Sequence, residues 1–371
     1  MKHYEVIIVG AGMAGASIAA EIAAHSSVLL IEQEQYAGYH STGRSAAFWT
    51  ETYGGPLVQP LTTASGKWMR MPPADISAES FLRKRQALNI ATEQNATKCD
   101  SFLTEFEKSG VRMEKVGRDT LEQWMPNIDE KWQSAVYEPD CCDIDVNAMH
   151  QAYLSAARRG GAEILCSARF EAARRNNEHW IVTINGEEFS ADKIVNAAGA
   201  WADDVARKSS VQIMGIKPYR RTVVQLRMEE PVRDDLPLIV SIDGDFYFKP
   251  EAGGRLWLSP LDETLVEASD IAPEELDIAI AIDHFHSVVD WKIEAVETKW
   301  AGLRSFSPDR LPVYGFDPLA PGFYWFAGQG GVGIQTAPAA AKIAKAQILG
   351  IEAEPLVADI DTEPYNADRF E

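Results

Sequence analysis

Three glycines near the start of the chain have the spacing of loops that hold phosphate groups. Gly10, Gly12 and Gly15 follow an apolar run and precede an alanine-rich helical pattern. The first permits a tight turn, the second lets backbone N–H groups approach a pyrophosphate, and the third lets helix and strand pack closely. A second apolar run, residues 28–31, ends in Glu32, where an acid can accept hydrogen bonds from ribose hydroxyls. The pattern predicts an adenine dinucleotide site and does not decide between FAD and NAD.

Arginine side chains at two places could hold a carboxylate. Arg304 lies among small and aromatic residues, and Arg221 lies near the start of a strand pattern at 219–228. A planar guanidinium binds a carboxylate through two parallel hydrogen bonds, and a buried charge needs such a partner. Because side chains alternate along a strand, only one of Arg220 and Arg221 can face the pocket. An exposed arginine on a strand surface is the alternative interpretation for each.

Two tyrosines could bind the same carboxylate through their hydroxyl groups. Tyr53 lies near the end of a long loop rich in Gly, Ser and Thr, and Tyr247 lies between two phenylalanines, so the two ring types face opposite sides of that strand. A packed core tyrosine is the alternative for each. We find no strong candidate for an obligatory protein base, because His40 is a lone loop histidine and such residues are more often structural.

These side chains must be positioned by elements that the sequence pattern predicts. Asn185 and Gly186 have the composition of a two-residue hairpin turn, and residues 81–92 are typical of a pair of strands. An aromatic strand runs into a glycine-rich turn over residues 323–333, and the helix after it is expected from about Thr336. We further predict a long loop at 35–55, helices at 62–70, 99–109, 148–159 and 273–293, and strands at 162–167, 170–174, 180–184, 219–228, 246–249 and 256–259.

The composition excludes several classes of protein. The chain has 371 residues and a formal charge of 35 − 55 = −20, which argues against nucleic acid and anionic membranes as partners. Its four cysteines form no C-x-x-C pair, which favours a cytoplasmic protein without a bound metal. We predict no signal peptide and no integral membrane segment. Peripheral association with the inner membrane stays open.

Dinucleotide-type segments lie at the start, at 193–201 and at 323–333, and long β patterns separate them. An ordinary NAD dehydrogenase would more often contain one contiguous set of βαβ units. We therefore predict an α/β fold in which a Rossmann-like domain is interrupted by a discontinuous substrate-binding domain of antiparallel β-sheet plus helices. The predicted boundaries are 1–50, 142–212 and 303–371 for the dinucleotide-binding domain, and 51–141 and 213–302 for the substrate-binding domain.

Four motifs together resemble the D-amino-acid oxidase family of FAD enzymes, which includes glycine oxidase and sarcosine oxidase. They are residues 10–15, 38–47, 195–201 and 329–336, and the resemblance spans almost the whole chain. It implies that the first domain binds FAD, and non-covalent binding is expected because no cysteine lies near the C-terminal turn. A reduced flavin carries negative charge, which free N–H groups at the start of the last helix would stabilise.

The resemblance also assigns particular residues to the cofactor. Residues near the first glycines contact the adenosine half, the loop at 41–47 wraps the flavin, and the C-terminal turn covers the flavin ring. The implied contacts are Gly10, Gly12, Ala14, Gly15, Glu32, Gln33, Ser41, Thr42, Gly43, Arg44, Ser45, Ala46, Ala47, Phe170, Ala198, Gly199, Gly330, Gly331, Val332, Gly333, Ile334, Gln335 and Thr336.

For the substrate, the resemblance selects Arg221 over Arg220 and implies oxidative deamination of a D-amino acid. Hydride would pass from Cα to flavin N5, and the resulting imino acid would hydrolyse to a 2-oxo acid and ammonia. Spacing does not determine the electron acceptor, whether quinone, dye or oxygen, or the oligomeric state. The implied substrate contacts are Tyr53, Arg221, Tyr247, Arg304 and the carbonyl of Gly331, which would orient the amine.

One departure within the family bears on the substrate. The chain resembles the bacterial D-arginine dehydrogenases most, and these place a glutamate against the substrate guanidinium where this chain has Ala87. Phe48 and Val332 likewise replace polar residues. Losing a buried acid removes an ion pair of about a few kcal/mol, so we predict a preference for neutral or apolar side chains over D-Arg.

Three alternatives stay open from the sequence. The first is another member of the same family that oxidises glycine, an N-methyl amino acid such as sarcosine, or a 2-hydroxy acid. The second is an NAD-dependent dehydrogenase, which would lack flavin absorbance. The third is a non-catalytic flavin-binding module, whose flavin no amine would reduce.

Overall fold

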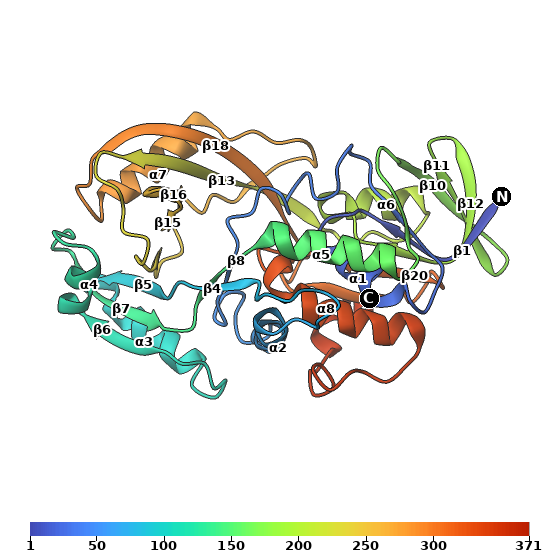
Figure 1. Ribbon diagram of the computed structural model, residues 1–371, viewed down its shortest axis with the longest axis horizontal. Coiled ribbons are helices and arrows are strands. Elements are labelled where there is room, and N and C mark those ends of the chain that lie inside the picture. Colours follow the sequence, from blue (N-terminus) through green and yellow to red (C-terminus); the bar gives the residue numbers. More distant parts are fainter. Residues whose placement is uncertain (371) are drawn as a thin grey trace.

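The dinucleotide-type segments come together in the first of three β-sheets (Figure 1). In the computed structural model, which describes residues 1–370, β1 lies between β2 and β12, and all three strands are parallel. Their apolar runs are buried on both faces, as in other parallel sheets. The sheet contains β10 (Phe170–Asn176), β11 (His179–Ile184), β12 (Glu187–Asn196), β1 (Lys2–Val9), β2 (Val28–Ile31) and β9 (Glu163–Leu165), with β20 (Phe323–Ala327) beside the end of β12 and β19 (Val313–Phe316) beside β20.

Helices α1, α5 and α8 gather beside this sheet, and their apolar residues form one core cluster with β1 and β20 (Figure 1). The Asp145 carboxylate accepts a hydrogen bond from the N–H of Ala148 at 2.8 Å and so caps the start of α5. The helices of this half are α1 (Met13–Ile22), α2 (Gln59–Arg70), α5 (Val146–Arg159), α6 (Ala202–Lys208) and α8 (Gly333–Leu349), with short 3-10 turns η2 (Gly199–Trp201), η3 (Glu363–Tyr365) and η4 (Ala367–Phe370).

The predicted hairpin turn is confirmed. Asn185 and Gly186 both have positive φ, 49° and 80°, and they join β11 to β12 as an antiparallel pair. Two consecutive residues of positive φ match the twist of the flanking strands, which is why Asn-Gly is favoured there.

The second sheet has ten strands and comes from other parts of the chain. Its pairs are antiparallel with one exception, since β5 and β14 are parallel. The predicted antiparallel sheet is therefore mixed at this one pair, whose strands belong to separate chain segments that no hairpin joins. In order, the strands are β21 (Gln329–Gly330), β18 (Ile293–Phe306), β13 (Lys217–Met228), β16 (Arg255–Ser259), β15 (Tyr247–Glu251), β14 (Leu238–Ser241), β5 (Ala87–Thr92), β7 (Trp132–Glu138) and β6 (Glu114–Gly117), with β17 (Thr264–Leu265) beside β13.

Helices cover this sheet and close a separate core. Apolar residues of α4, α7 and the central strands form one cluster, and a smaller cluster lies under α3. The predicted helix at 273–293 ends earlier, at His286, because Val288 and Val289 turn into that core. The helices are α3 (Ala96–Glu105), α4 (Arg118–Trp124) and α7 (Glu275–His286), with the 3-10 turn η1 (Glu93–Asn95) before α3.

A third, three-stranded sheet joins the two halves. It contains β3 (Phe48–Trp49), β8 (Cys142–Ile144) and β4 (Leu82–Lys84). Residues 81–92 contain two strands as predicted, but the strands do not pair with each other, because β4 pairs with β8 whereas β5 enters the second sheet. Gln86, with φ of 71°, turns the chain between them.

The first and second sheets meet at the C-terminal turn. β20 ends in the first sheet, and β21 then pairs with β18 of the second sheet at Ser305 and Phe306. β18 and β13 are the longest strands and pair along most of their length (Figure 1). This junction brings the glycine-rich turn next to the start of α8 and the end of β18.

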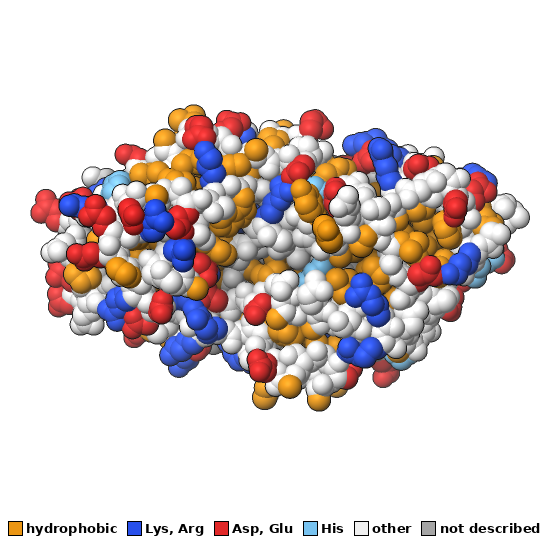
Figure 2. Space-filling model, turned by 45° about the horizontal axis from the view of Figure 1, so that its top comes forward, with side chains coloured by type: hydrophobic (Ala, Val, Ile, Leu, Met, Phe, Trp, Pro, Cys, Tyr) orange, Lys and Arg blue, Asp and Glu red, His pale blue; other side chains and the backbone are white. Residues whose placement is uncertain are grey.

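The surface is hollowed near the middle of the face shown in Figure 2, and charged side chains of both signs surround the hollow. Within residues 1–370, no helix has both the length and the apolar composition required to cross a membrane.

Candidate active site and cofactor cavity

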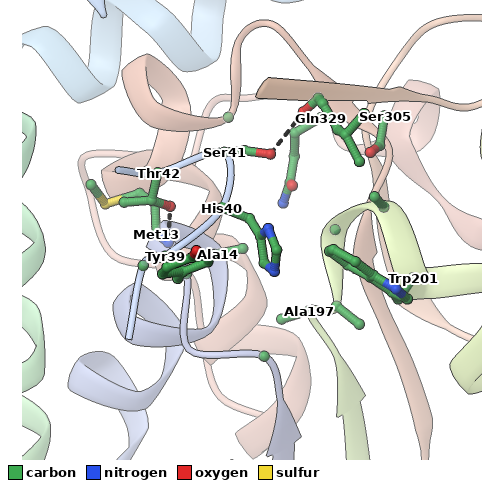
Figure 3. Close-up of a pocket in the computed structure, with 18 of the residues that line it drawn as sticks. Met13, Ala14, Tyr39, His40, Ser41, Thr42, Ala197, Trp201, Ser305 and Gln329 are labelled. Carbon is green, nitrogen blue, oxygen red and sulfur yellow. Dashed lines mark hydrogen bonds between the residues drawn. The ribbon is translucent and has the colours of Figure 1, made fainter. Parts of the chain in front are cut away.

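A long cavity lies along the ends of β1, β2 and β12. One end is lined by Gly10, Gly12 and Glu32, and the other by Gly330 and Arg304. Figure 3 shows Met13, Ala14 and Thr42 on one side of the cavity and Ala197 with Trp201 on the other. The cavity therefore connects the first glycine motif to the C-terminal turn, which lies more than 300 residues later in the sequence.

The first glycine motif packs in the way its spacing predicts. Gly10 has φ of 101°, and a Cβ there would lie 2.6 Å from the carbonyl oxygen of Ala197. A Cβ on Gly15 would lie 1.9 Å from the carbonyl oxygen of Gly10. The two glycines thus permit β12 and α1 to approach the turn after β1, and the start of α1 faces the cavity.

Glu32 presents acceptors at the same end of the cavity. Its two carboxylate oxygens accept one backbone hydrogen bond each, from the N–H of Ala11 at 3.0 Å and from that of Glu34 at 3.1 Å. A carboxylate has about four acceptor positions, so free lone pairs are left for the hydroxyls of a ribose. Gln33 and Phe170 line the cavity beside it.

The loop at 38–47 is held against β18. Ser41 donates a hydrogen bond to the carbonyl of Leu303 at 2.7 Å, and the Thr42 hydroxyl accepts one from the N–H of Met13 at 2.9 Å (Figure 3). The Arg44 guanidinium donates to the Ala301 carbonyl at 3.2 Å. These bonds fix the loop along the middle of the cavity.

His40 belongs to the wall of the cofactor cavity. Its Nε2 lies 3.0 Å from the Glu34 carboxylate, and its ring centroid lies 4.6 Å from that of Trp201. Figure 3 shows its ring between Tyr39 and Trp201. These contacts agree with the structural interpretation of this histidine.

The C-terminal turn closes the other end. A Cβ on Gly330 would lie 2.2 Å from the Phe306 ring, and one on Gly331 would lie 2.0 Å from the Tyr53 hydroxyl. The helix after the turn begins at Gly333, earlier than the expected start at Thr336. Its first turn has no side-chain cap, so backbone N–H groups beside the cavity are available to an anionic group.

This cavity fits FAD. The glycines at one end make a cradle that a Cβ would fill, Glu32 keeps free acceptor positions beside it, and an uncapped helix start lies at the far end. The pyrophosphate would be held at the start of α1, the adenosine by Glu32 and its neighbours, and the flavin by the loop and the C-terminal turn. Bound FAD supplies a two-electron acceptor at that end.

A second cavity of about 720 Å³ adjoins the flavin end. We call it the substrate cavity. It shares Arg221, Arg304, Gln329 and Gly331 with the cofactor cavity, so these residues lie at the junction. Its walls are largely apolar or aromatic, and the lining includes Phe48, Tyr53, Ala87, Phe102, Leu238, Val240, Tyr247, Leu261 and Phe306.

The two arginines lie on one face of the β13–β18 pair. Arg221 is directly opposite Gly302, and Arg304 lies two residues further along the same strand. Arg220 points to the opposite face, where its guanidinium lies 2.9 Å from the Asp277 carboxylate. Strand alternation therefore sends Arg221 to the cavities and Arg220 into a separate ion-pair network.

Arg221 is almost fully buried, and one of its guanidinium nitrogens makes no hydrogen bond within residues 1–370. Its Nε donates to the Asp262 carbonyl at 2.9 Å, and its Nη2 lies 3.1 Å from the Glu263 carboxylate. Its buried Nη1 has no hydrogen-bond partner among the residues described. Burial, together with the positive charge of Arg304, lowers the pKa of Arg221 to about 10. An anion at this point would satisfy the free donor and offset the repulsion.

The two tyrosines flank the arginines. Tyr53 accepts a hydrogen bond from Arg304 at 2.6 Å. Tyr247 is buried, and burial raises the pKa of its hydroxyl. The Phe48 ring lies between them, 6.0 Å from the Tyr53 ring and 5.7 Å from the Tyr247 ring, centroid to centroid. The three rings form one wall of the substrate cavity.

The structure gathers all five predicted substrate contacts around one cavity, and most predicted cofactor residues around the other. Gln335 instead lies beneath the loop, where its side-chain amide donates to the Tyr53 carbonyl at 3.0 Å. Val332 lines the substrate cavity alone. The predicted residues that do not line the cofactor cavity are Gly15, Gly43, Ala47, Val332, Gln335 and Thr336.

Sequence reasoning missed four charged residues of the substrate cavity, Glu138, Glu263, Asp309 and Arg310, and Glu138 is the most buried of them. Glu138 is 4% exposed. The expectation of a cavity without an acid near Ala87 is wrong, because Glu138 is the residue directly opposite Ala87 on the neighbouring strand. The two positions are 51 apart in sequence, so only strand pairing could have revealed their proximity.

The fold and the two adjoining cavities define a dinucleotide-binding α/β protein with a second, separate sheet beside the cofactor cavity. The model of the FAD dependent oxidoreductase family, DAO, matches residues 5–347, and the chain belongs to this family. The predicted family, the α/β fold and the FAD cofactor are confirmed, and the alternative of an NAD-dependent dehydrogenase is wrong.

Several characterised proteins are similar to this chain. The bifunctional protein ThiO/ThiG of Synechocystis is 25% identical over 95% of the chain, and human mitochondrial dimethylglycine dehydrogenase is 23% identical over 84%. The chain spans 53% and 38% of the length of these two relatives. Glycine oxidase of Geobacillus kaustophilus is 23% identical, with 91% of each chain covered. Its crystal structure superimposes with a TM-score of 0.85 at 20% identity, covering 100% of this chain and 99% of that one.

Proposed function

We propose that the protein oxidises the Cα–N bond of an α-amino acid, with a primary or an N-alkylated amine, and with FAD as the electron acceptor. The observation that carries the proposal is the unused Nη1 of Arg221 beside Arg304, at the junction of the two cavities. A substrate carboxylate there would bind both guanidinium groups and the two tyrosine hydroxyls. Its Cα would then lie toward the flavin end of the cofactor cavity.

The proposed reaction removes two electrons from the substrate. The Cα–H bond breaks and its hydrogen leaves as hydride, while the substrate nitrogen gives up one proton and forms a C=N bond. Water then adds to that bond and releases the amine, leaving a 2-oxo acid. The chain would contribute orientation and charge through Arg221, Arg304 and the Gly331 carbonyl.

Two substrate classes fit this arrangement. The names of the relatives favour glycine or an N-methyl amino acid, which is the alternative left open by the sequence, over the D-amino acids predicted first. The substrate cavity supports a substrate larger than glycine, because its volume of about 720 Å³ is more than glycine needs. A substituent on Cα or on nitrogen would occupy it.

We also propose the domain assignment predicted from the sequence. Residues 1–50, 142–212 and 303–371 would bind FAD, and residues 51–141 and 213–302 would bind the substrate. The membership of the strands in two separate sheets supports this division, except that β21 and the end of β18 lie in the proposed FAD-binding segment and belong to the second sheet.

Anaerobic mixing of the holoenzyme with candidate substrates tests the proposed function. Glycine, sarcosine, other N-methyl amino acids and matched D- and L-amino acids should be added separately while the absorbance of the oxidised flavin is followed. Loss of that absorbance with at least one α-amino acid, and none with the corresponding amine that lacks the carboxylate, is the expected result. A flavin that no α-amino acid bleaches would indicate a non-catalytic module.

Substituting Gly331 tests the geometry at the junction. In Gly331→Ala, the added Cβ would lie 2.0 Å from the Tyr53 hydroxyl and 3.0 Å from Arg304 Nη1, so both side chains must shift. A displacement of about 1 Å at a reacting site costs about 100-fold in rate. We expect kcat/KM to fall about 10- to 100-fold while the flavin content stays near that of the wild type, and an unchanged kcat/KM would place the substrate elsewhere.

A further inference from the structure

Glu138 occupies a position in the substrate cavity that the reaction described above does not use. It is the last residue of β7 and lies directly opposite Ala87 on β5. Side chains at such opposed positions point to the same face of the sheet, with Cβ atoms about 5 Å apart. Because Ala87 carries only a methyl group, the Glu138 carboxylate has space beside it at the cavity wall.

The bonds of Glu138 come from neutral donors. The hydroxyls of Thr50 and Thr52 donate to it at 2.6 and 2.8 Å, and the Asn89 amide donates at 3.0 Å. Thr52 and Asn89 share Oε1, whereas Oε2 accepts from Thr50 alone. A carboxylate has about four acceptor positions, so one is free, on Oε2.

Glu138 also differs in charge balance from the other acids that line the cavity. Glu263 lies 2.9 Å from Arg310, and Asp309 lies 2.8 Å from Arg369. Within residues 1–370, no arginine, lysine or histidine forms an ion pair with Glu138, whose partners are the three neutral groups. A buried carboxylate without a cation is costly, and burial raises the pKa of Glu138.

Glu138 and the two arginines line different parts of the cavity. Arg221 and Arg304 lie where it meets the cofactor cavity, whereas Glu138, Ala87 and Asn89 line the substrate cavity alone. The aromatic side chains of Phe48, Tyr53 and Tyr247 line the same cavity. The cavity is thus complementary to a molecule with a carboxylate at one end and a cation at the other.

We propose that Glu138 is the binding site for an ammonium or guanidinium group at the far end of the substrate, carried on a substituent of Cα or of the nitrogen. The proposal rests on the proposed function, since it assumes that the α-carboxylate binds Arg221 and Arg304. It replaces the predicted preference for neutral or apolar side chains, whose premise was a cavity without an acid.

The wild-type holoenzyme tests this proposal with pairs of compounds that differ in one charge. D-Arginine is compared with D-citrulline, D-lysine with D-2-aminoheptanoate, and N-(4-aminobutyl)glycine with N-pentylglycine. The rate of anaerobic flavin reduction is measured against concentration for each compound. We expect the cation to be favoured about 10- to 100-fold in at least one pair, the range of a charge-assisted hydrogen bond. Equal rates or a preference for the neutral member in every pair would overturn the proposal.

A pair of variants tests whether Glu138 is the source of the preference for cationic substrates. Glu138→Gln should lower the ratio of cationic to neutral substrate at least about tenfold. Glu114→Gln is the matched control, because Glu114 lies on β6 beside β7 but is exposed and does not line the cavity, and its ratio should equal that of the wild type. A wild-type ratio in Glu138→Gln would also overturn the proposal.

Failure of the subsite is distinguishable from failure of the proposed function. If glycine, sarcosine or a neutral amino acid reduces the flavin and no cation is preferred, the proposed function stands and Glu138 has no part in recognition. If no α-amino acid reduces the flavin, the proposed function itself is wrong.

Discussion

Replacing Arg221 with methionine is expected to lower kcat/KM about 100-fold or more, mainly through a higher KM. Removing one member of a buried, hydrogen-bonded charge pair costs about 2–5 kcal/mol, and each 1.4 kcal/mol corresponds to about tenfold in rate. In the proposed reaction the substrate carboxylate is bound in the same way before and during hydride transfer, so loss of the Arg221 guanidinium would weaken binding in both states and raise KM. Steady-state kinetics with the best substrate of the amino-acid panel provides the measurement.

The flavin content and the fold should survive this change. Arg221 is desolvated, is repelled by Arg304 and leaves Nη1 unused, so an apolar side chain of similar length suits the unliganded site. Arg227→Met is the matched control, because Arg227 lies on the same strand but its side chain is 49% exposed and remote from both cavities. If Arg221→Met kept the wild-type KM with full flavin content, the substrate carboxylate would bind elsewhere.

Local sequence patterns predicted the parts of this site that depend on a few neighbouring residues. The hairpin turn at Asn185 and Gly186 requires only two consecutive positive φ angles, and the first glycine motif requires one strand, one turn and one helix. The choice between Arg220 and Arg221 was limited to two residues by strand alternation, although the pattern itself could not say which one faces inward.

Long-range pairing was not accessible in the same way. Residues 81–92 contain two strands as predicted, but β4 and β5 find their partners in different sheets. Glu138 shows the consequence for function. Ala87 carries no acid, but Glu138 supplies one from the directly opposite position on the neighbouring strand. No residue close to either of them in sequence indicates that the two lie together. Pairing depends on which segments the whole chain brings together, and local composition does not encode that.

The two sheets contribute different residues to the site, and the connection between the sheets holds these residues together. The chain passes from β20 to β21 across a single residue, Gly328, so the turn beside the flavin end is held by both sheets at once. Arg304 and Ser41 are held by the same strand, β18, since Ser41 bonds to the Leu303 carbonyl. The proposed substrate and cofactor contacts are therefore fixed relative to each other by one continuous strand.

The second large effect is expected from Gly15→Ala, which should produce protein with little or no bound FAD. In an isolated helix, alanine would be favoured over glycine by about 1 kcal/mol, so helix propensity alone predicts a gain in stability. Packing opposes this, because the added Cβ would lie 1.9 Å from the carbonyl oxygen of Gly10. That carbonyl belongs to the backbone and cannot rotate away as a side chain can.

The contacts of Gly10 decide how the strain is released. Gly10 is also closely packed on its other side, because a Cβ on it would lie 2.6 Å from the Ala197 carbonyl oxygen. The turn therefore cannot move toward β12. The start of α1 must therefore move outward, which takes its N–H groups away from the pyrophosphate and adds an overpacking cost of about 1–3 kcal/mol.

The ratio of flavin to protein absorbance and the dissociation constant for added FAD measure the effect. Gly117→Ala is the control, because a Cβ there meets no atom within 4 Å at the start of α4. Full flavin content in Gly15→Ala would mean that the close packing of α1 on the turn is not what holds the cofactor.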